Sequence, residues 1–342
     1  MRQLTYVGPG ALDWREVPSP VIAAATDALV RPIAVARCDL DLAIARGHAA
    51  FPGPFAMGHE AVGVVVDAGD QAGLSPGERV VVPFQLSCGR CDNCRRGFTN
   101  SCSAFPPRAA YGMKPLCGTE FGGALSDLIH VPFADHMLVK LPPALDPVAH
   151  ASLADNIPDA WRAVAPQLKA RPGARVLIIG GWAQSIGLYA AGIAASLGAG
   201  EVLYLDDDPD RRRHAVAVGA RAEPLELASR RALKFDITVA AHGDPEALRF
   251  AIHSTAPNGV ITVVAIFFEE LVGLPLRAMY TRGITLHTSR VQARAELPQV
   301  LAHCAAGHFH PGKVTSRVVP FVEAAEGMLD PGPKIVFVKE TG

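Results

Sequence analysis

Residues 176–206 read VLIIGGWAQSIGLYAAGIAASLGAGEVLYLD, and this stretch decides the fold of the second half of the chain. A short apolar run is broken by two glycines, continues as an uncharged helical pattern, and is followed by a second apolar run. The segment Val176–Gly200 carries no charge, but the glycine break and the polar Gln184 and Ser185 favour a buried strand and helix over a membrane span. Strand, helix and strand in this order predict a parallel sheet with right-handed crossovers.

The same alternation continues towards the C-terminus. We therefore predict one doubly wound α/β domain over residues 151–288. The predicted strands are Val176–Ile179, Glu201–Leu205, Asp236–Ala240 and Gly259–Ala265, and the predicted helices are Ser185–Leu197, Pro209–Val218 and Pro245–Ser254. Residues 289–342 contain a predicted helix near Leu297–Ala306 and a predicted final strand at Lys334–Lys339.

The first 150 residues show a different pattern of hydrophobic residues. Short β-branched runs separated by Gly and Pro replace the long helical periods, as in Ala28–Val35, Ala61–Val66 and Arg79–Pro83. Such runs predict a compact, mostly antiparallel β domain. A chain of 342 residues is longer than one hydrophobic core usually serves, which agrees with two domains.

Composition excludes several classes of protein. Hydrophobic residues make up 49% and charged residues 19% of the chain, so it is not a disordered protein. The formal net charge is -1 and no segment concentrates basic residues, so we expect no nucleic-acid partner. The N-terminus shows no apolar run of the signal-peptide kind, so we expect a cytoplasmic protein without a membrane partner.

Four of the seven cysteines lie within 15 residues, with the spacing Cys-x2-Cys-x2-Cys-x7-Cys. They are Cys88, Cys91, Cys94 and Cys102. In a chain without an export signal, such a cluster indicates metal binding rather than disulfides, and four thiolates suit a tetrahedral structural zinc. An iron–sulfur cluster is the alternative, but its cysteine run closes with a nearer cysteine followed by proline, whereas Ser103 follows the last cysteine here.

The glycine-rich turn predicts a dinucleotide site, because it lies between a strand and a helix. Its spacing contains two residues more than G-x-G-x-x-G; we place Gly180 and Gly181 near the pyrophosphate and Gly187 between helix and strand. Asp206 ends the next strand, where a carboxylate accepts ribose hydroxyls and repels a 2′-phosphate. Two further aspartates follow it, so we predict NAD(H) rather than NADP(H); the alternative is a solvated acidic turn.

A catalytic zinc needs about three protein ligands and one open position. Outside the cysteine cluster the candidates are Cys38, in VARCDLD, and His59, in GHE. A lone Cys or His is more often a core residue, so spacing alone leaves this second metal site open.

Taken together, these features resemble the zinc-dependent medium-chain alcohol dehydrogenases over essentially the whole chain. The resemblance is carried by Cys38 with Asp41 three residues later, the Gly-His-Glu of residues 58–60, the cysteine cluster, and LADNIPDAW at residues 153–161. It implies a GroES-like catalytic domain at 1–150 with a zinc lobe at 88–102. It further implies a Rossmann NAD-binding domain at 151–288, and a segment at 289–342 that returns to the catalytic domain.

The resemblance also implies roles for individual residues. Cys38, His59 and Asp155 would hold a catalytic zinc in addition to the structural one, with Glu60 beside it as an exchanging ligand or an outer carboxylate. Asp41 matches the aspartate that orients the zinc histidine. The remaining implied residues are Leu40, Phe84 and Trp161 in the substrate pocket, Arg211 near the adenosine ribose, and Lys334 facing the pyrophosphate.

The implied activity is hydride transfer between NAD(H) and a small-molecule alcohol/carbonyl pair, in a homodimer or homotetramer. Two departures from the family matter: Leu40 replaces the usual proton-relaying Ser or Thr, and Ala43 replaces the relay histidine of some members. A specialised carbonyl or iminium reductase, an aldehyde dismutase, and a non-catalytic NAD-binding sensor therefore remain as alternatives. Cys38 and His59 disfavour a zinc-free quinone reductase, and the neutral charge disfavours a zinc-ribbon nucleic-acid binder.

Overall fold

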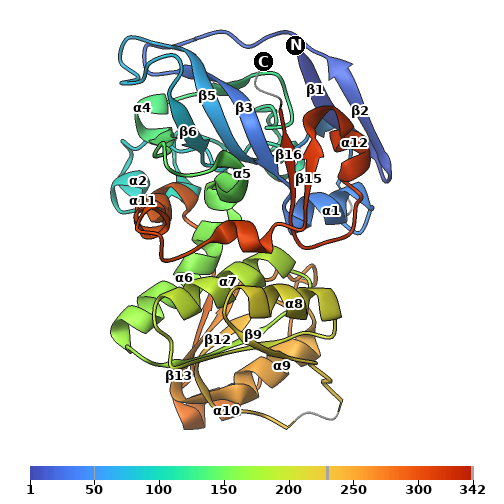
Figure 1. Ribbon diagram of the computed structural model, residues 1–342, viewed down its shortest axis with the longest axis vertical. Coiled ribbons are helices and arrows are strands. Elements are labelled where there is room, and N and C mark those ends of the chain that lie inside the picture. The colour runs from blue at the N-terminus through green and yellow to red at the C-terminus, as the bar shows by residue number, and fades with distance from the viewer. Residues whose placement is uncertain (50, 229–230, 340–342) are drawn as a thin grey trace. The chain divides into compact units, whose positions relative to one another are not determined.

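The computed structural model describes residues 1–49, 51–228 and 231–339, and its contacts group them into two compact units (Figure 1). Unit 1 contains Met1–Pro158, Val291–Ala305 and the described residues from Thr315 onward. Unit 2 contains Asp159–Arg290 and Ala306–Val314. In the described part of the chain, no helix is long and apolar enough to cross a membrane.

Unit 1 is built on two β-sheets, one with the strand order β2-β1-β4 and one with the order β15-β16-β3-β5-β6-β8, in which β7 also pairs with β3. Its strands are β1 (Arg2–Gly8), β2 (Ala11–Glu16), β3 (Ala28–Ala36), β4 (Phe55–Ala56), β5 (Glu60–Ala68), β6 (Arg79–Val82), β7 (Ile129–Val131), β8 (Val139–Lys140), β15 (Arg317–Pro320) and β16 (Ile335–Val338). All pairs except β15–β16 are antiparallel, which confirms the predicted β-rich domain.

Apart from α11, the helices of unit 1 are short. They are α1 (Asp39–Ala45), α2 (Asp92–Arg95), α3 (Lys114–Cys117), α4 (Ala134–Met137), α5 (Pro147–His150), α11 (Ala293–Ala305) and α12 (Ala324–Gly327), with 3-10 turns η1 (Thr99–Ser101), η2 (Ala151–Ala154) and η4 (Phe321–Glu323). Since η2 ends directly before Asp155, it sets the position of that predicted ligand.

Unit 2 is a six-stranded parallel sheet with the strand order β11-β10-β9-β12-β13-β14. The strands are β9 (Arg175–Ile179), β10 (Glu201–Leu205), β11 (Arg221–Glu223), β12 (Phe235–Ala240), β13 (Thr255–Val263) and β14 (Thr285–Thr288). The helices are α6 (Asn156–Ala170), which starts in unit 1, α7 (Gln184–Ser196), α8 (Pro209–Ala217), α9 (Pro245–Ser254) and α10 (Leu276–Arg282), with the 3-10 turn η3 (Pro311–Val314). In Figure 1, α7 and α8 cover one face of the sheet and α9 and α10 the other, which confirms the doubly wound fold.

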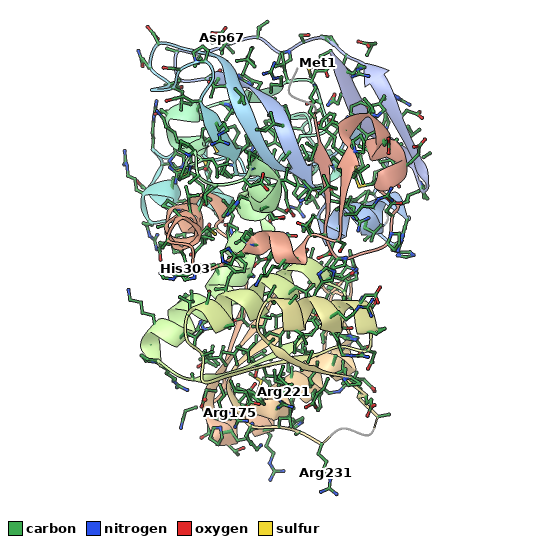
Figure 2. The ribbon with its side chains drawn as sticks, in the orientation of Figure 1. Met1, Asp67, Arg175, Arg221, Arg231 and His303 are labelled. Carbon is green, nitrogen blue, oxygen red and sulfur yellow. The ribbon has the colours of Figure 1, made fainter. Side chains whose placement is uncertain are left out.

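The alternation seen in the sequence explains this core. The apolar run at Val176–Ile179 lies in β9, at the centre of the sheet, and its residues are fully buried. Leu177 and Ile179 pack with residues of β10 and α9 in one cluster. At the amino ends of the strands, Arg175 and Arg221 both donate hydrogen bonds to Glu201 (Figure 2).

The residues of the C-terminal segment are divided between the two units. Residues 306–314 belong to unit 2, whereas we placed all of 289–342 in a segment that returns to the first domain. The reason is local packing: the Phe309 ring meets the Tyr189 ring edge to face at 6.3 Å, and His214 Nδ1 lies 3.0 Å from Lys313 O.

Candidate metal centre and cofactor site

Strand register brings the predicted ligands of unit 1 together. β3 and β5 run antiparallel with Ala36 opposite Glu60, so Cys38, just past β3, comes beside His59, just before β5. β16 pairs with the other side of β3 and brings Lys334 to the same end of the sheet. Three segments that are far apart in the sequence therefore meet at one place.

The ligand atoms of Cys38, His59, Glu60 and Asp155 all lie within 4.8 Å of one another. All four residues are buried. A thiol sulfur, an imidazole nitrogen and carboxylate oxygens are donors that zinc accepts in proteins. The donor set therefore fits the zinc that the sequence predicts at this point.

Asp41 fixes the imidazole of His59. Asp41 Oδ1 lies 3.2 Å from His59 Nδ1, and Asp41 Oδ2 accepts a hydrogen bond from the Cys38 amide at 3.0 Å. The second ring nitrogen, Nε2, lies 3.4 Å from Asp155 Oδ2. Burial lowers the pKa of His59, but the carboxylates of Asp41 and Asp155 outweigh this and hold that pKa well above its ordinary value. A carboxylate at Nδ1 leaves Nε2 to face a metal, as in many zinc sites.

Glu60 is paired with a buried ammonium. Lys334 Nζ lies 3.2 Å from both carboxylate oxygens of Glu60, and both side chains are 0% exposed. Lys334 Nζ also donates to Arg37 O at 2.9 Å and to Asn156 Oδ1 at 2.8 Å. Burial raises the pKa of Glu60 to about 7, although the Lys334 charge acts in the opposite direction.

The structure gives Lys334 partners within unit 1, and its place facing the pyrophosphate of the cofactor stays a prediction. An ammonium has three N–H donors. In unit 1 these face the Glu60 carboxylate, a backbone carbonyl and an amide oxygen, and the side chain has no exposed surface. The register of β16, which the sequence pattern does not reveal, buries this residue beside Cys38.

Asn156 is a site residue that the sequence analysis did not single out. Its Nδ2 donates to Asp155 Oδ2 at 2.9 Å and to Cys38 Sγ at 3.4 Å, and its Oδ1 accepts from Lys334. The available signal was a polar side chain directly after a predicted ligand, in an otherwise apolar stretch.

The four cysteines of the lobe also converge. Their sulfur atoms lie within 4.8 Å of one another, and Cys91 Sγ and Cys102 Sγ are 3.9 Å apart. Backbone N–H groups point at the sulfurs: Cys88 N lies 3.3 Å from Cys102 Sγ, and Arg90 N lies 3.4 Å from Cys88 Sγ. Backbone hydrogen bonds lower the pKa of Cys91 to about 5, whereas burial raises the pKa of Cys94 and of Cys102. Because such contacts favour thiolates, the four-sulfur set fits a tetrahedral zinc.

Close approaches in unit 2 explain the three loop glycines. A β-carbon at Gly180 would lie 2.4 Å from the Tyr204 hydroxyl. At Gly181, where φ is +151°, it would lie 2.6 Å from the ring of His242. At Gly187 it would meet a side chain of the segment after β12 at 3.3 Å, so Gly187 lets α7 pack against the sheet.

The turn itself is folded against the end of β12. The Trp182 amide donates to His242 O at 3.1 Å, and the Ala183 amide donates to Ala241 O at 2.8 Å. α7 begins at Gln184, and the N–H groups of a first helical turn have no acceptor within their own helix. A phosphate would therefore meet the free N–H groups in the first turn of α7 rather than the amides of the glycine-rich loop.

Asp206 lies at the carboxyl end of β10 and accepts four hydrogen bonds. Oδ1 accepts from Asp208 N at 2.9 Å and from Arg211 Nη2 at 2.6 Å. Oδ2 accepts from the Tyr204 hydroxyl at 2.9 Å and from Arg211 Nε at 2.7 Å. A ribose hydroxyl must displace one of these donors, and Arg211, whose side chain is 19% exposed, is the one with room to move.

The residues predicted for the substrate pocket lie in both units. Phe84 is buried, and its ring centre lies 5.4 Å from that of His59. Leu40 lies in the first turn of α1, two residues after Cys38. Trp161 is buried on α6 in unit 2. Their contact with a substrate stays a prediction.

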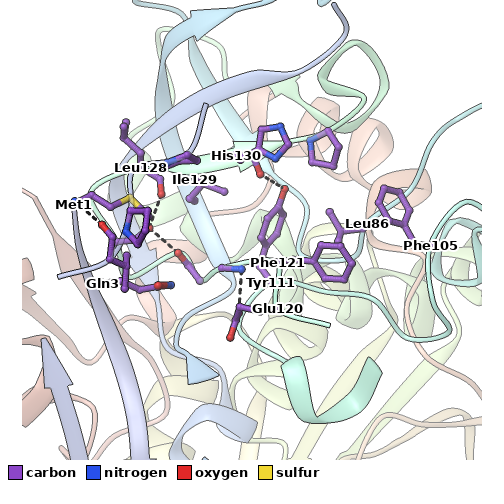
Figure 3. Close-up of a pocket in the computed structure, with 17 residues that line it drawn as sticks. Met1, Gln3, Leu86, Phe105, Tyr111, Glu120, Phe121, Leu128, Ile129 and His130 are labelled. Carbon is purple, nitrogen blue, oxygen red and sulfur yellow. Dashed lines mark hydrogen bonds between the residues drawn. The ribbon is translucent and has the colours of Figure 1, made fainter. Parts of the chain in front are cut away.

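Unit 1 also holds a cavity of about 540 Å³ with a mostly apolar lining (Figure 3). Phe105, Phe121 and Tyr111 contribute rings to it, and the Tyr111 hydroxyl donates to His130 O at 2.9 Å. None of the four predicted ligands of the catalytic zinc lines this cavity.

Comparison with known proteins agrees with the fold and with a zinc-binding dehydrogenase. The family model of the alcohol dehydrogenase GroES-like domain matches residues 24–143, and that of the zinc-binding dehydrogenases matches residues 185–306. Among solved structures, an alcohol dehydrogenase from Thermus sp. ATN1 superimposes with a TM-score of 0.89 at 29% identity, covering 99% of this chain and 100% of that chain.

Curated relatives give the same assignment. A probable zinc-binding alcohol dehydrogenase of Mycobacterium tuberculosis is 28% identical over 333 residues, which is 96% of this chain and 84% of that protein. A glutathione-independent formaldehyde dehydrogenase of Pseudomonas aeruginosa is 32% identical over 232 residues, which is 64% of this chain and 57% of that protein.

Proposed function

The chain belongs to the zinc-dependent medium-chain dehydrogenase/reductase family, and we propose that it transfers hydride between NAD(H) and the alcohol/carbonyl pair of a small molecule. The observation that carries this proposal is the convergence of the Cys38, His59 and Asp155 side chains at one buried point. The family makes the chain an oxidoreductase; the substrate and the choice of nicotinamide cofactor are the proposal.

Each residue of the metal centre has a task in this proposal. Cys38, His59 and Asp155 would hold the zinc, while Asp41 holds the imidazole through Nδ1. When bound, zinc polarises the substrate oxygen and lowers the pKa of an alcohol. Phe84, packed on the His59 ring, keeps that side of the site apolar.

The carboxylates at the end of β10 support NAD(H). Asp206 is held in place by Tyr204 and Arg211, and Asp208 caps α8 through the amides of its first turn. Asp207 accepts from the amide of Leu225, so all three carboxylates have fixed positions. Residues 206–213 contain more aspartates than arginines, although Arg212 also donates to Asp206 O, so a 2′-phosphate would meet a net negative charge.

A second candidate is the dismutation of an aldehyde. One aldehyde would be hydrated and oxidised to the acid while a second is reduced to the alcohol, so that NAD(H) is regenerated. Two observations favour it: Leu40 offers no hydroxyl to relay an alcohol proton, and a formaldehyde dehydrogenase is among the relatives.

The oligomeric state, the kind of partner and the location of the protein are also proposals. We propose a homodimer or homotetramer, because β14 is an edge strand of unit 2 and this unit exposes Leu271 and Tyr280 to 89% each. The absence of a concentrated basic segment supports a small-molecule substrate rather than a nucleic acid, and we propose a cytoplasmic protein. Light scattering of the purified protein tests the oligomer.

The first experiment is a metal count on the purified protein, with Cys38→Ser as the control. One zinc fewer per chain in the variant is expected, since the lobe keeps its own. The zinc-loaded protein is then mixed with NAD and a panel of alcohols, and NADH absorbance is followed. Equal amounts of acid and alcohol from an aldehyde, without net NADH, would select dismutation. NADH binding without turnover on any substrate would favour the sensor and contradict both activities.

A further inference from the structure

Asn156 connects two of the predicted zinc ligands through one side-chain amide. It lies directly after Asp155, at the start of α6, and is 1% exposed. Its Nδ2 lies 2.9 Å from Asp155 Oδ2 and 3.4 Å from Cys38 Sγ. One NH2 group therefore reaches a carboxylate and a sulfur that come from segments more than a hundred residues apart.

The neighbours of this amide allow one orientation. Lys334 Nζ lies 2.8 Å from Asn156 Oδ1, and an ammonium can only donate. The Asp155 carboxylate can only accept, and the Cys38 sulfur accepts as the thiolate that would bind zinc, so the NH2 group must face Asp155 and Cys38. Turning the amide over would place NH2 against the ammonium and oxygen against two anionic groups. Lys334 is in turn held by Glu60 and by a backbone carbonyl.

We propose that Asn156 is a positioning residue for the catalytic zinc: it orients Cys38 and Asp155 and reduces the electron donation of the Cys38 sulfur. The inference rests on the proposed function, because it requires zinc at these ligands. Groups that hydrogen-bond metal ligands typically change metal affinity by about 10–100-fold when they are removed. An N–H donor at a thiolate also lowers the energy of the sulfur lone pairs and so weakens the charge that sulfur gives to a metal.

Cobalt substitution tests this without any measurement of turnover. Cobalt(II) bound to a thiolate shows a sulfur-to-metal charge-transfer band, and subtracting the spectrum of Cys38→Ser removes the contribution of the cysteine lobe. Asn156→Ala should move the Cys38 band to longer wavelength and weaken zinc binding, measured against a chelator, by about 10–100-fold. Asn156→Asp keeps the side-chain shape and the contact of an oxygen with Lys334 but removes both N–H donors, so it should shift the band in the same direction.

Ser126→Ala is the matched control, because Ser126 is a buried polar residue of unit 1 whose hydroxyl donates to the backbone carbonyls of Gly123 and Leu128. Its band and affinity should equal those of the wild type. If Asn156→Ala does not fold, the band of Asn156→Asp decides the question. A wild-type band in a folded Asn156 variant would overturn the inference and leave the zinc site intact. Equal metal content in wild type and Cys38→Ser would instead overturn the proposed function.

Discussion

Replacing Lys334 by methionine should strongly destabilise unit 1, because it leaves a buried carboxylate without its cation. Lys334 and Glu60 are both 0% exposed, and the ammonium lies 3.2 Å from both carboxylate oxygens. Removing one partner of such a pair costs about 3–5 kcal/mol. Since whole domains unfold at about 5–15 kcal/mol, this is a large fraction of the total.

The cost should depend on pH in a defined direction. The pKa of Glu60 is raised from 4.5 to about 7, so the folded state binds this proton more tightly than the unfolded state. Stability therefore falls as pH rises from 4.5 to about 7. Burial raises this pKa while Lys334 lowers it, so Lys334→Met should raise it further. At about pH 5.5 Glu60 is then protonated in both proteins. The destabilisation caused by Lys334→Met at that pH comes only from the lost hydrogen bonds and is about 2 kcal/mol.

Urea unfolding at about pH 8 and pH 5.5 measures both values, on protein dialysed against EDTA so that no metal competes with Lys334 for the Glu60 charge. Lys339→Met is the matched control: its ammonium pairs at 2.7 Å with Asp127 at a partly exposed site, so it should cost under about 1 kcal/mol. The double variant Lys334→Met/Glu60→Gln should regain much of the loss. Equal losses for the two Lys→Met variants at pH 8, or a loss independent of pH, would refute the reasoning.

Three further variants test the cofactor site, the lobe and the proton relay. Asp206→Ala should lower the preference for NAD over NADP by about 10–100-fold, because it removes a carboxylate and frees Arg211 for a 2′-phosphate; the ratio of kcat/KM for the two cofactors checks this, and an unchanged ratio contradicts it. Cys102→Ser should lower the zinc content by one ion and the melting temperature by several degrees while the charge-transfer band of cobalt-loaded Cys38 persists; loss of that band would show that the two sites are not independent. Leu40→Ser should raise alcohol oxidation by about 10-fold if the missing hydroxyl limits it, and an unchanged kcat would place the proton path elsewhere.

The elements that could be predicted are those whose periodicity is long and uninterrupted. Glu201–Leu205 and Pro245–Ser254 have the predicted bounds, β9 differs from its prediction by one residue at its start, and α7 differs by one residue at each end. The pattern missed β11 and β14, which have three and four residues. Such short edge strands carry too few alternating positions to stand out, and they form because a neighbouring strand supplies their hydrogen bonds.

The candidate site also contains residues that local sequence predicts and contacts that it does not. Cys38, His59 and Asp155 could be named because each lies in a short motif that resembles a known family. The Asp206–Arg211 contact spans five residues of one strand–helix turn, so proximity in the sequence was enough to suggest both residues. The four donors to the Asp206 carboxylate could not be counted beforehand, because the sequence does not show which rotamers aim the Tyr204 hydroxyl and the Arg211 guanidinium at it.

The unexpected partners of Lys334 and the absence of a prediction for Asn156 have a single cause. The contact between Lys334 Nζ and Asn156 Oδ1 joins residues 178 positions apart, and neither residue has a recognisable role without the other. A lysine near the chain end gives no sign in the sequence of the buried carboxylate and amide oxygen that accept its hydrogen bonds. An asparagine at a helix start resembles a cap until its oxygen is seen to be held by that lysine, which turns its N–H groups towards the ligands. Where a polar group is buried, its partners decide what it does, and those partners are set by strand register rather than by local sequence.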